Sequence, residues 1–227
     1  MTDQILKKMK NSVPFGALFD LDGVLIDSET TYTRFWSEID RIYPTGIENY
    51  ALAIKGTTLP EIMRHYEDSR VKADILRRIT EFQETMVYEL YPGVADFLSM
   101  LRDNSVPMAI VTSSDDRKME LLFRQHPAFR GFFTSVIDAS MVTRSKPDPQ
   151  GYLLGAEKIG VSPENCFVFE DSLQGLKAGR AAGAMVIGLA TTYPARKIAP
   201  LADMVIDGLG GVSMNDLIGL KDSLSRP

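Results

Sequence analysis

The sequence is poor in the residues that form disulfides and histidine-dependent sites. Cys166 is its only cysteine, so no intrachain disulfide is possible and a reducing compartment, the cytoplasm, is expected. The only histidines, His65 and His126, lie outside every motif that suggests chemistry. Their placement argues against histidine-dependent triads and histidine-bound metal ions as leading hypotheses.

Long apolar runs and an excess of positive charge are also missing. No apolar run approaches the ~20 residues that a membrane-spanning helix needs. Lys plus Arg total 25 against 30 Asp plus Glu, which gives a formal net charge of −5. A nucleic-acid groove normally shows as a basic surface, so neither a nucleic acid nor a membrane is expected as a partner. The expected partner is a small molecule, and the expected assembly is a monomer or weak dimer.

Apolar sequence is plentiful, and it alternates in the manner of an α/β protein. Hydrophobic residues make up 44% of the 227 residues, enough for one α/β domain and a smaller accessory domain. Segments with apolar residues at helical spacing alternate with short apolar runs, as a parallel sheet requires. The expected strands are residues 17–19, 108–112, 136–137, 166–170, 185–189 and 204–206. The expected helices are residues 30–42, 60–66, 73–90, 94–102, 117–125, 150–159 and 175–182.

A block of expected helices separates the first strand from the rest of the sheet, which indicates an insertion. We therefore expect an α/β fold, with a Rossmann-like open parallel sheet core and an inserted small helical cap domain. The segments that join the two, residues 27–29 and 91–93, form the expected hinge for closure of the cap. The expected parts are an N-terminal extension at residues 1–12, a core at residues 13–28 and 92–227, and a cap at residues 29–91.

Two carboxylates follow the first expected strand. Asp20 and Asp22 lie where open α/β sheets bind ligands, and two like charges this close are unfavourable unless a cation neutralises them or one takes up a proton. An aspartate can act as a nucleophile and form an aspartyl-phosphate, and Asp20, directly after the strand, suits that role. Asp22 suits the acid/base, which gives a proton to the leaving oxygen and then withdraws one from water.

Three further motifs suit phosphate chemistry. Thr112 and Ser113 bring hydroxyls and backbone N–H groups to the start of a helix, and Lys146 brings a point positive charge, so these residues are expected to bind phosphate. Glu170 and Asp171 lie at the end of an apolar strand and are expected to complete a cation site with the aspartate pair. An oxygen-only set without cysteine or histidine favours Mg²⁺ over Zn²⁺ as the cofactor.

Each motif also has a simpler interpretation. An Asp-x-Asp-Gly sequence is by itself a common turn. The hydroxyls after residue 112 can cap a helix, and Ser114 or Asp115 is the expected cap. A lysine such as Lys146 is usually exposed. The combination of the motifs in one chain favours the catalytic interpretation over these.

Together the motifs resemble those of the haloacid dehalogenase-like superfamily, and the resemblance covers nearly the whole chain. It is strongest to the branch with a helical cap between the first and second motifs, which includes phosphoglycolate phosphatases, sugar-phosphate phosphatases and β-phosphoglucomutase. The resemblance implies that Asp20 is the nucleophile and a Mg²⁺ ligand. It implies that Asp22 is the acid/base and lends its backbone carbonyl to the metal. An aspartate two residues after the nucleophile is typical of phosphatases and mutases and argues against a dehalogenase.

The resemblance extends to the other motifs. It implies that Thr112 and Lys146 bind the transferring phosphate. It also implies that Asp171 binds Mg²⁺ with help from Glu170.

Substrate choice is expected to lie in the cap. Lys55 and Gly56 resemble the cap loop that β-phosphoglucomutase places over its sugar substrate, although an exposed loop lysine is an equally good account of Lys55. Tyr32 stands where the mutase pattern has a histidine, and Leu59 stands where it has an arginine that grips the distal phosphate. Loss of that arginine removes a charge-assisted bidentate contact, which favours a phosphatase over a mutase.

We therefore expect a Mg²⁺-dependent phosphatase that hydrolyses a small phosphorylated metabolite, such as a sugar phosphate, through an aspartyl-phosphate intermediate. A β-phosphoglucomutase-like sugar-phosphate mutase is the first alternative. An inorganic pyrophosphatase and a non-catalytic module that binds a phosphorylated ligand are the others.

Overall fold

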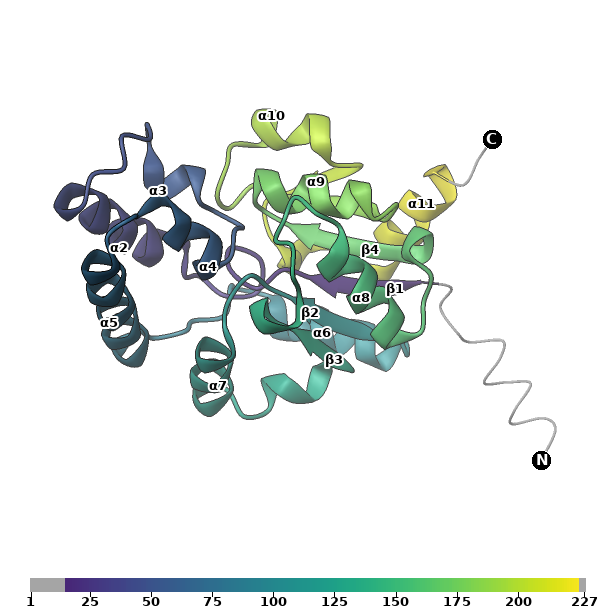
Figure 1. Cartoon of the computed structure of the whole chain (residues 1–227). Helices are drawn as coiled ribbons and strands as arrows, with labels where there is room; N and C mark the ends of the chain where they lie inside the picture. Colours follow the sequence, from purple (N-terminus) through teal and green to yellow (C-terminus); the bar gives the residue numbers. More distant parts are fainter. Residues whose placement is uncertain (1–14, 225–227) are drawn as a thin grey trace, which may run out of the picture.

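A six-stranded parallel sheet lies between two layers of helices in the computed structural model, which describes residues 15–224 (Figure 1). The expected N-terminal extension, residues 1–12, lies outside the described residues. The sheet order is β3-β2-β1-β4-β5-β6, and all neighbouring strands are parallel. The expected Rossmann-like α/β core is therefore confirmed. The strands are β1 (Gly16–Phe19), β2 (Met108–Val111), β3 (Ser135–Ile137), β4 (Cys166–Glu170), β5 (Met185–Leu189) and β6 (Met204–Ile206).

Side-chain alternation along the strands supplies an apolar surface to each helical layer. In β1, Leu18 packs into the cluster on one face of the sheet, while Ala17 and Phe19 pack into the cluster on the other. Burial on both faces explains why the strands are continuous apolar runs in the sequence. The first cluster includes residues of α8 (Gln150–Ile159) and α9 (Leu173–Ala181), and the second includes residues of α6 (Val94–Asp103), α7 (Asp116–Gln125) and α11 (Met214–Leu224).

The order of the strands brings three polar segments to one edge of the sheet. Strand β1 pairs with β2 on one side and with β4 on the other, so the chain order reverses at β1. Asp20, Thr112 and Asp171 are the first residues after β1, β2 and β4. Open α/β sheets bind ligands in the crevice outside the carboxyl ends of the strands at such a reversal.

A group of helices between β1 and β2 lies to one side of the sheet (Figure 1). It has an apolar cluster of its own, in which Trp36, Ile39 and Ile75 are buried. The division of the chain at residues 28/29 and 91/92 stays a prediction. The helices of the group are α2 (Glu29–Ile42), α3 (Tyr50–Ala53), α4 (Leu59–Ile62), a 3₁₀ turn (Met63–His65) and α5 (Ser69–Thr85).

The two segments that join these helices to the sheet lie side by side. Ile26 forms an antiparallel bridge with Leu90. The Asp27 amide donates to the Glu89 carbonyl at 2.8 Å, on the same pair of segments. The backbone of each segment is therefore held by the other.

The helix expected at residues 73–90 is wrong at both ends, because α5 spans Ser69–Thr85. It begins earlier because Asp68 caps it, accepting a hydrogen bond from the Arg70 amide at 2.7 Å. It ends earlier because the following residues alternate like an extended segment, with Met86 buried and Val87 67% exposed. Over so few residues, apolar positions of an extended segment resemble those of a helix.

Other short elements differ from the expectation. The helix expected at residues 60–66 is split into α4 and a 3₁₀ turn, and the sequence did not predict α3, α10 (Ala195–Ile198) or α11. Within residues 15–224, none of the helices has both the length and the apolar character needed to cross a bilayer. The remaining 3₁₀ turns are Phe129–Phe132, Ala139–Met141, Pro163–Asn165, Ala199–Leu201 and Leu209–Gly211.

Candidate active site

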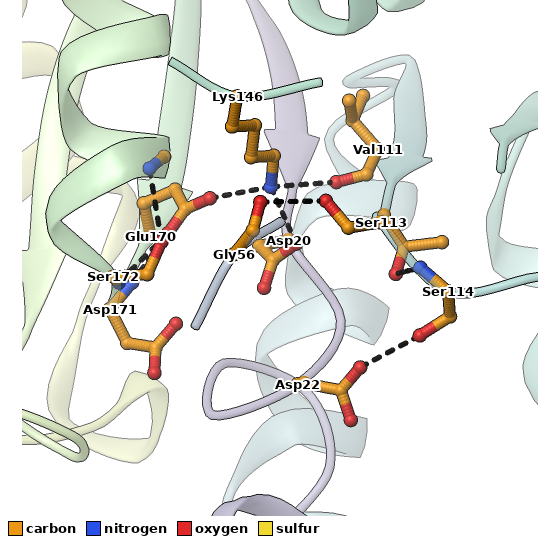
Figure 2. A network of polar contacts seen from close by, with 12 residues as sticks. Asp20, Asp22, Gly56, Val111, Ser113, Ser114, Lys146, Glu170, Asp171 and Ser172 are labelled. Carbon is orange, nitrogen blue, oxygen red and sulfur yellow. Dashed lines mark hydrogen bonds and ion pairs between the residues drawn. The ribbon is translucent and has the colours of Figure 1, made fainter. Parts of the chain in front are cut away.

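Asp20 and Lys146 form a buried ion pair at the carboxyl end of β1 (Figure 2). Lys146 Nζ donates to Asp20 Oδ1 at 2.6 Å, to Glu170 Oε1 at 2.5 Å and to the Val111 carbonyl at 3.3 Å. Burial acts to lower the pKa of Lys146, but the charges of Asp20 and Glu170 outweigh it, so the pKa is raised. Lys146 is therefore a fixed cation between two acids, and the interpretation as an exposed surface lysine is excluded.

Glu170 organises the acidic side of the site. Its Oε1 also accepts from the Tyr152 hydroxyl at 2.8 Å, and its Oε2 accepts from the backbone amides of Asp171 and Ser172 at 3.0 and 2.9 Å. A Cβ added at Gly175, in the first turn of α9, would overlap the Glu170 carboxylate. The fully buried Glu170 thus needs a glycine beside it.

Three acids are close enough to share a cation. One carboxylate oxygen from each of Asp20, Glu170 and Asp171 lies within 4.8 Å of the others. Asp171 Oδ1 is buried and accepts no hydrogen bond from the described residues, whereas its Oδ2 accepts from the Thr192 hydroxyl. A buried carboxylate oxygen without a donor, in an oxygen-only set, fits a Mg²⁺ ion.

Burial shifts the ionisation of these acids. It raises the pKa of Asp20 to about 7, against the opposing effect of Lys146. Burial also raises the pKa of Asp171 well above its usual range, and the charges of Glu170 and Asp20 add to the shift. A cation bound between these acids would favour their ionised forms.

The Asp22 carboxylate has a different set of partners. Lys118 Nζ donates to its two oxygens at 2.5 and 2.6 Å, Ser114 Oγ donates to Oδ2 at 2.9 Å, and Ser28 Oγ donates to Oδ1. Burial acts to raise the pKa of Asp22, but the Lys118 ion pair and these hydrogen bonds outweigh it and lower the pKa. The side chain of Asp22 is not part of the group of acids that can share a cation.

The hydroxyls after β2 have separate partners. Thr112 Oγ1 accepts from the Ser114 amide at 3.0 Å. Ser113, expected to bind phosphate, donates its hydroxyl to the Gly56 carbonyl of the cap at 2.8 Å. Asp115 caps α7, because its Oδ1 accepts from the Lys118 amide at 2.9 Å. Of the two expected caps, Asp115 is therefore the helix cap.

A pocket of about 780 Å³, including its open mouth, connects the acids to the cap. Tyr32, Lys55 and Gly56, which the sequence predicts to select the substrate, line it, and that role stays a prediction. Burial lowers the pKa of Lys55, against the opposing charges of Asp171 and Asp22. The ring of Tyr32 lies over another amine, with Lys118 Nζ 4.2 Å from its centroid. Further apolar residues of the cap also line the pocket, namely Trp36, Ile54, Leu59, Ile62 and Ile79.

Sequence reasoning missed Lys118, Tyr152 and Thr192. For Lys118 a signal existed, because it occupies an inward position of α7 beside the buried Met119 and Leu122. A lysine in the apolar stripe of a short helix indicates a buried partner. No comparable local signal marks Tyr152 or Thr192.

Comparisons with known proteins agree with this geometry. The family model of the haloacid dehalogenase-like hydrolases matches residues 16–183. Hexitol phosphatase A of Escherichia coli is 36% identical over 184 residues, which cover 77% of this chain and 82% of that protein. The probable pseudouridine-5'-phosphatase of Drosophila melanogaster is 29% identical over 236 aligned residues, which cover 95% of this chain and 100% of that protein. The solved β-phosphoglucomutase of Clostridium difficile shares the fold, with a TM-score of 0.76 at 19% identity over 93% of this chain and 99% of that one.

The expected family and the expectation of an enzyme are confirmed: the chain belongs to the haloacid dehalogenase-like hydrolase family.

Proposed function

We propose that this protein is a Mg²⁺-dependent phosphatase that hydrolyses a small phosphorylated metabolite through an aspartyl-phosphate on Asp20. The observation that carries the proposal is the buried arrangement of Lys146 between Asp20 and Glu170, with Asp171 alongside. It supplies a nucleophile, a fixed positive charge and an oxygen-only cation site around one point. The named phosphatases among the relatives support the same reaction class.

In the first step, an Asp20 carboxylate oxygen attacks phosphorus as the ester oxygen departs. Lys146 holds Asp20 Oδ1 at 2.6 Å, which limits rotation of the carboxylate. Negative charge on the phosphoryl oxygens is compensated by Lys146 and by the amides that follow Thr112. Thr112, buried at the end of β2, offers its hydroxyl to the same phosphate.

Proton transfer is the role of Asp22. It gives a proton to the departing ester oxygen, and then takes one from the water that attacks the aspartyl-phosphate. Orthophosphate leaves, and Asp20 and Asp22 return to their starting states. Asp22 lies two residues beyond Asp20 and lines the same pocket, so both carboxylates face one substrate.

The residues that would hold Mg²⁺ are Asp20 and Asp171, with Glu170 and the backbone carbonyl of Asp22 contributing. When bound, the ion supplies positive charge that offsets the charge on the phosphoryl group and the acids. Glu170 already accepts hydrogen bonds at both oxygens, so it contributes mainly by holding Lys146.

The pocket favours a monophosphate over a bisphosphate. Among the described residues that line it, the cations are Lys55 and Lys118, and no arginine is present. Leu59 lines the pocket at the position where the mutase resemblance has an arginine. A second phosphate would lack a bidentate partner there, which ranks the mutase reaction second.

The test is a phosphate-release screen of the full chain, with Mg²⁺ and with a chelator instead. It includes p-nitrophenyl phosphate, hexose, hexitol and pentose phosphates, glycerol phosphate, phosphoglycolate, nucleotides and pyrophosphate. We expect Mg²⁺-dependent release from a subset of small monoesters and little from pyrophosphate. A parallel reaction with β-glucose 1-phosphate and a bisphosphate primer measures isomerisation.

Each outcome separates the alternatives. Efficient formation of glucose 6-phosphate would establish the mutase, and preferential release from pyrophosphate would establish the pyrophosphatase. Binding of phosphorylated ligands without turnover would favour the non-catalytic module. Undiminished release in the presence of the chelator would contradict the Mg²⁺ requirement.

A further inference from the structure

Lys118 is a buried amine that the reaction as described so far does not use. Its side chain is 3% exposed, although it lies on α7, a helix on the surface of the core. Burial of an ammonium group is costly unless the group is paired and hydrogen-bonded. Lys118 meets this need through Asp22, whose two oxygens lie 2.5 and 2.6 Å from Nζ.

The environment of Lys118 leaves its charge directed at Asp22. The ring of Tyr32, from the cap helix α2, covers Nζ at 4.2 Å from the centroid. Gln83 of α5 donates weakly to the Tyr32 hydroxyl at 3.4 Å. A cation over an aromatic face is stabilised without a competing hydrogen bond, so the directed hydrogen bonds of Nζ go to the carboxylate.

The Asp22 carboxylate is held from three directions. Lys118 of α7 contacts both oxygens, Ser114 contacts Oδ2, and Ser28, just before α2, contacts Oδ1. Figure 2 shows the side chain of Asp22 directed toward Ser114, below Asp20 in that view. Only Lys118 carries charge among these donors, and charge-assisted hydrogen bonds are roughly twice as strong as neutral ones.

We propose that Lys118 is a positioning residue that holds the Asp22 carboxylate in place for proton transfer to the leaving oxygen. The proposal rests on the proposed phosphatase function. In the step concerned, the Asp20 oxygen–phosphorus bond forms and the bond from phosphorus to the ester oxygen breaks. Asp22 gives that ester oxygen the proton that it took from water during hydrolysis of the preceding aspartyl-phosphate. The negative charge left on Asp22 then lies against Lys118 Nζ, which keeps its own protons.

The proposal predicts that Lys118 matters most where the leaving group needs a proton. An aryl oxide such as p-nitrophenolate leaves without protonation, whereas the alkoxide of glycerol phosphate or a sugar phosphate does not. General acid catalysis contributes typically 10²–10⁴-fold, and loss of its positioning removes part of that. We therefore expect Lys118→Met to lower kcat/KM for an alkyl phosphate by about 10- to 100-fold and for p-nitrophenyl phosphate by less than about threefold.

The ratio of the two kcat/KM values is the decisive readout. Because both are measured on one preparation, the ratio does not depend on the fraction of protein that is folded. Lys177→Met removes an exposed lysine from α9 and is the matched control, for which the ratio should not change. Lys118→Arg keeps a charged donor and should recover part of the alkyl phosphate activity.

A double-mutant comparison shows whether Lys118 acts through Asp22. Asp22→Asn should change the ratio in the same direction as Lys118→Met, and adding Lys118→Met to Asp22→Asn should change it no further. An unchanged ratio in Lys118→Met, which means equal fold losses of kcat/KM with both esters, would overturn the positioning role while leaving the phosphatase function intact. The same conclusion would follow if the effects of the two substitutions on the ratio were additive in the double variant. Absence of turnover by the unaltered protein with both esters would overturn the proposed function and this inference with it.

Discussion

Asp20 and Asp22 lie two positions apart and have opposite surroundings. For Asp20 burial dominates and raises the pKa to about 7, although Lys146 is paired with it. For Asp22 the Lys118 ion pair and the hydroxyl donors outweigh burial, and the pKa is lowered. Two chemically identical side chains therefore receive opposite pKa shifts from their neighbours, and a cation held by Asp20 and Asp171 would favour the ionised form that the proposed nucleophile needs.

Replacement of the nucleophile gives the first prediction at the scale of the residue. Asp20→Asn preserves the shape of the side chain but removes the attacking carboxylate, so kcat should fall by more than about 10³-fold. Initial rates with the best substrate of the screen measure this. Asp207→Asn is the control, because Asp207 follows β6 as Asp20 follows β1 but is exposed. Residual activity of Asp20→Asn near that of Asp207→Asn would contradict the nucleophile assignment.

The buried acids predict a stabilising effect of Mg²⁺. A ligand at 100 times its Kd stabilises the folded state by about 2.7 kcal/mol, which corresponds to a rise in Tm of roughly 5–10 °C for a chain of this size. Asp171→Asn should abolish most of this rise, because it replaces the carboxylate whose Oδ1 has no hydrogen-bond partner among the described residues. Thermal melts with and without Mg²⁺ measure it. Equal shifts in Asp171→Asn and the unaltered protein would place the ion elsewhere.

At the scale of the element, the junction of β4 and α9 serves both stability and the site. Ser172 caps α9 by accepting from the Gly175 amide at 3.0 Å, and its own amide donates to Glu170 at 2.9 Å. Helix α9 therefore begins at the residue that also fixes the Glu170 carboxylate. The start of the helix and the position of Lys146 are coupled through that acid.

Gly175→Ala tests this coupling. Helix propensity alone predicts a gain of up to about 1 kcal/mol, but a Cβ at Gly175 would overlap the Glu170 carboxylate. We expect a net loss of about 1–3 kcal/mol in the free energy of unfolding, together with lower kcat, because Lys146 shifts with Glu170. Gly219→Ala in α11, with no atom within 4 Å of the added Cβ, should instead be neutral or stabilising. Denaturant unfolding measures the stability of both variants. A gain in stability for Gly175→Ala would contradict the overlap between its Cβ and the Glu170 carboxylate.

An ion-pair group ties α5 to the end of α2. Asp74 accepts hydrogen bonds from Arg78 at 2.5 Å, from Arg77 at 2.7 Å and from the Tyr43 hydroxyl at 2.9 Å. The hydrogen bonds of Arg78, Arg77 and Tyr43 lower the pKa of Asp74 below its usual value of 3.8. Because the folded-state pKa is depressed, the ionised carboxylate contributes stability above the unfolded-state pKa and loses it as the pH falls through the folded-state pKa.

Asp74→Asn should therefore reduce Tm by a small, constant amount from neutral pH down to about pH 5, and by less below about pH 4. The group is solvent-exposed, so the reduction should stay below about 4 °C. Thermal melts in a series of buffers measure this. Asp103→Asn, an exposed aspartate beside Arg102, is the control and should change Tm less. A difference that grows in acid would contradict the sign of the argument.

At the scale of the whole molecule, hydrogen bonds and an exposed ion pair join the cap to the core beside the pocket. Ser113 Oγ donates to the Gly56 carbonyl at 2.8 Å, and the Tyr193 hydroxyl donates to the Leu52 carbonyl at 3.0 Å. Arg117 on α7 pairs with Glu84 of α5 between exposed side chains. We expect these contacts to break and re-form as the cap opens for substrate and closes for reaction.

We predict that the cap closes on ligand. Small-angle scattering should show a smaller radius of gyration with Mg²⁺ and orthovanadate, a phosphate analogue, than without them. Tyr193→Phe removes the hydrogen bond from the core to the Leu52 carbonyl of the cap, worth about 0.5–1.5 kcal/mol, and should raise KM by roughly 2- to 10-fold. Superimposable scattering profiles, together with an unchanged KM in Tyr193→Phe, would show that the cap does not move.

The core and most of the proposed catalytic set were predictable from the sequence because parallel strands end at one edge. Asp20, Thr112 and Asp171 directly follow apolar strands, so their meeting needs only the strand order. Lys146 was recognisable from its motif, although its position between Asp20 and Glu170 was not. The predicted end of the helix at residue 90 was wrong, because buried positions of the extended segment after Thr85 resemble helical spacing over a few residues.

The sequence by itself determined the parallel sheet, the family and the acids at the edge of the sheet, because local apolar patterns and strand-end positions are written in neighbouring residues. Only the tertiary structure decided that Lys118 pairs with Asp22, 96 residues away, and that Ser113 binds the backbone of Gly56. These pairs depend on which side of α7 faces the core and on where the cap packs. The apolar stripe of α7 indicates that Lys118 faces inward, but local sequence encodes neither the partner that Lys118 meets nor the packing of the cap, because each is the result of burying two separate apolar surfaces against each other.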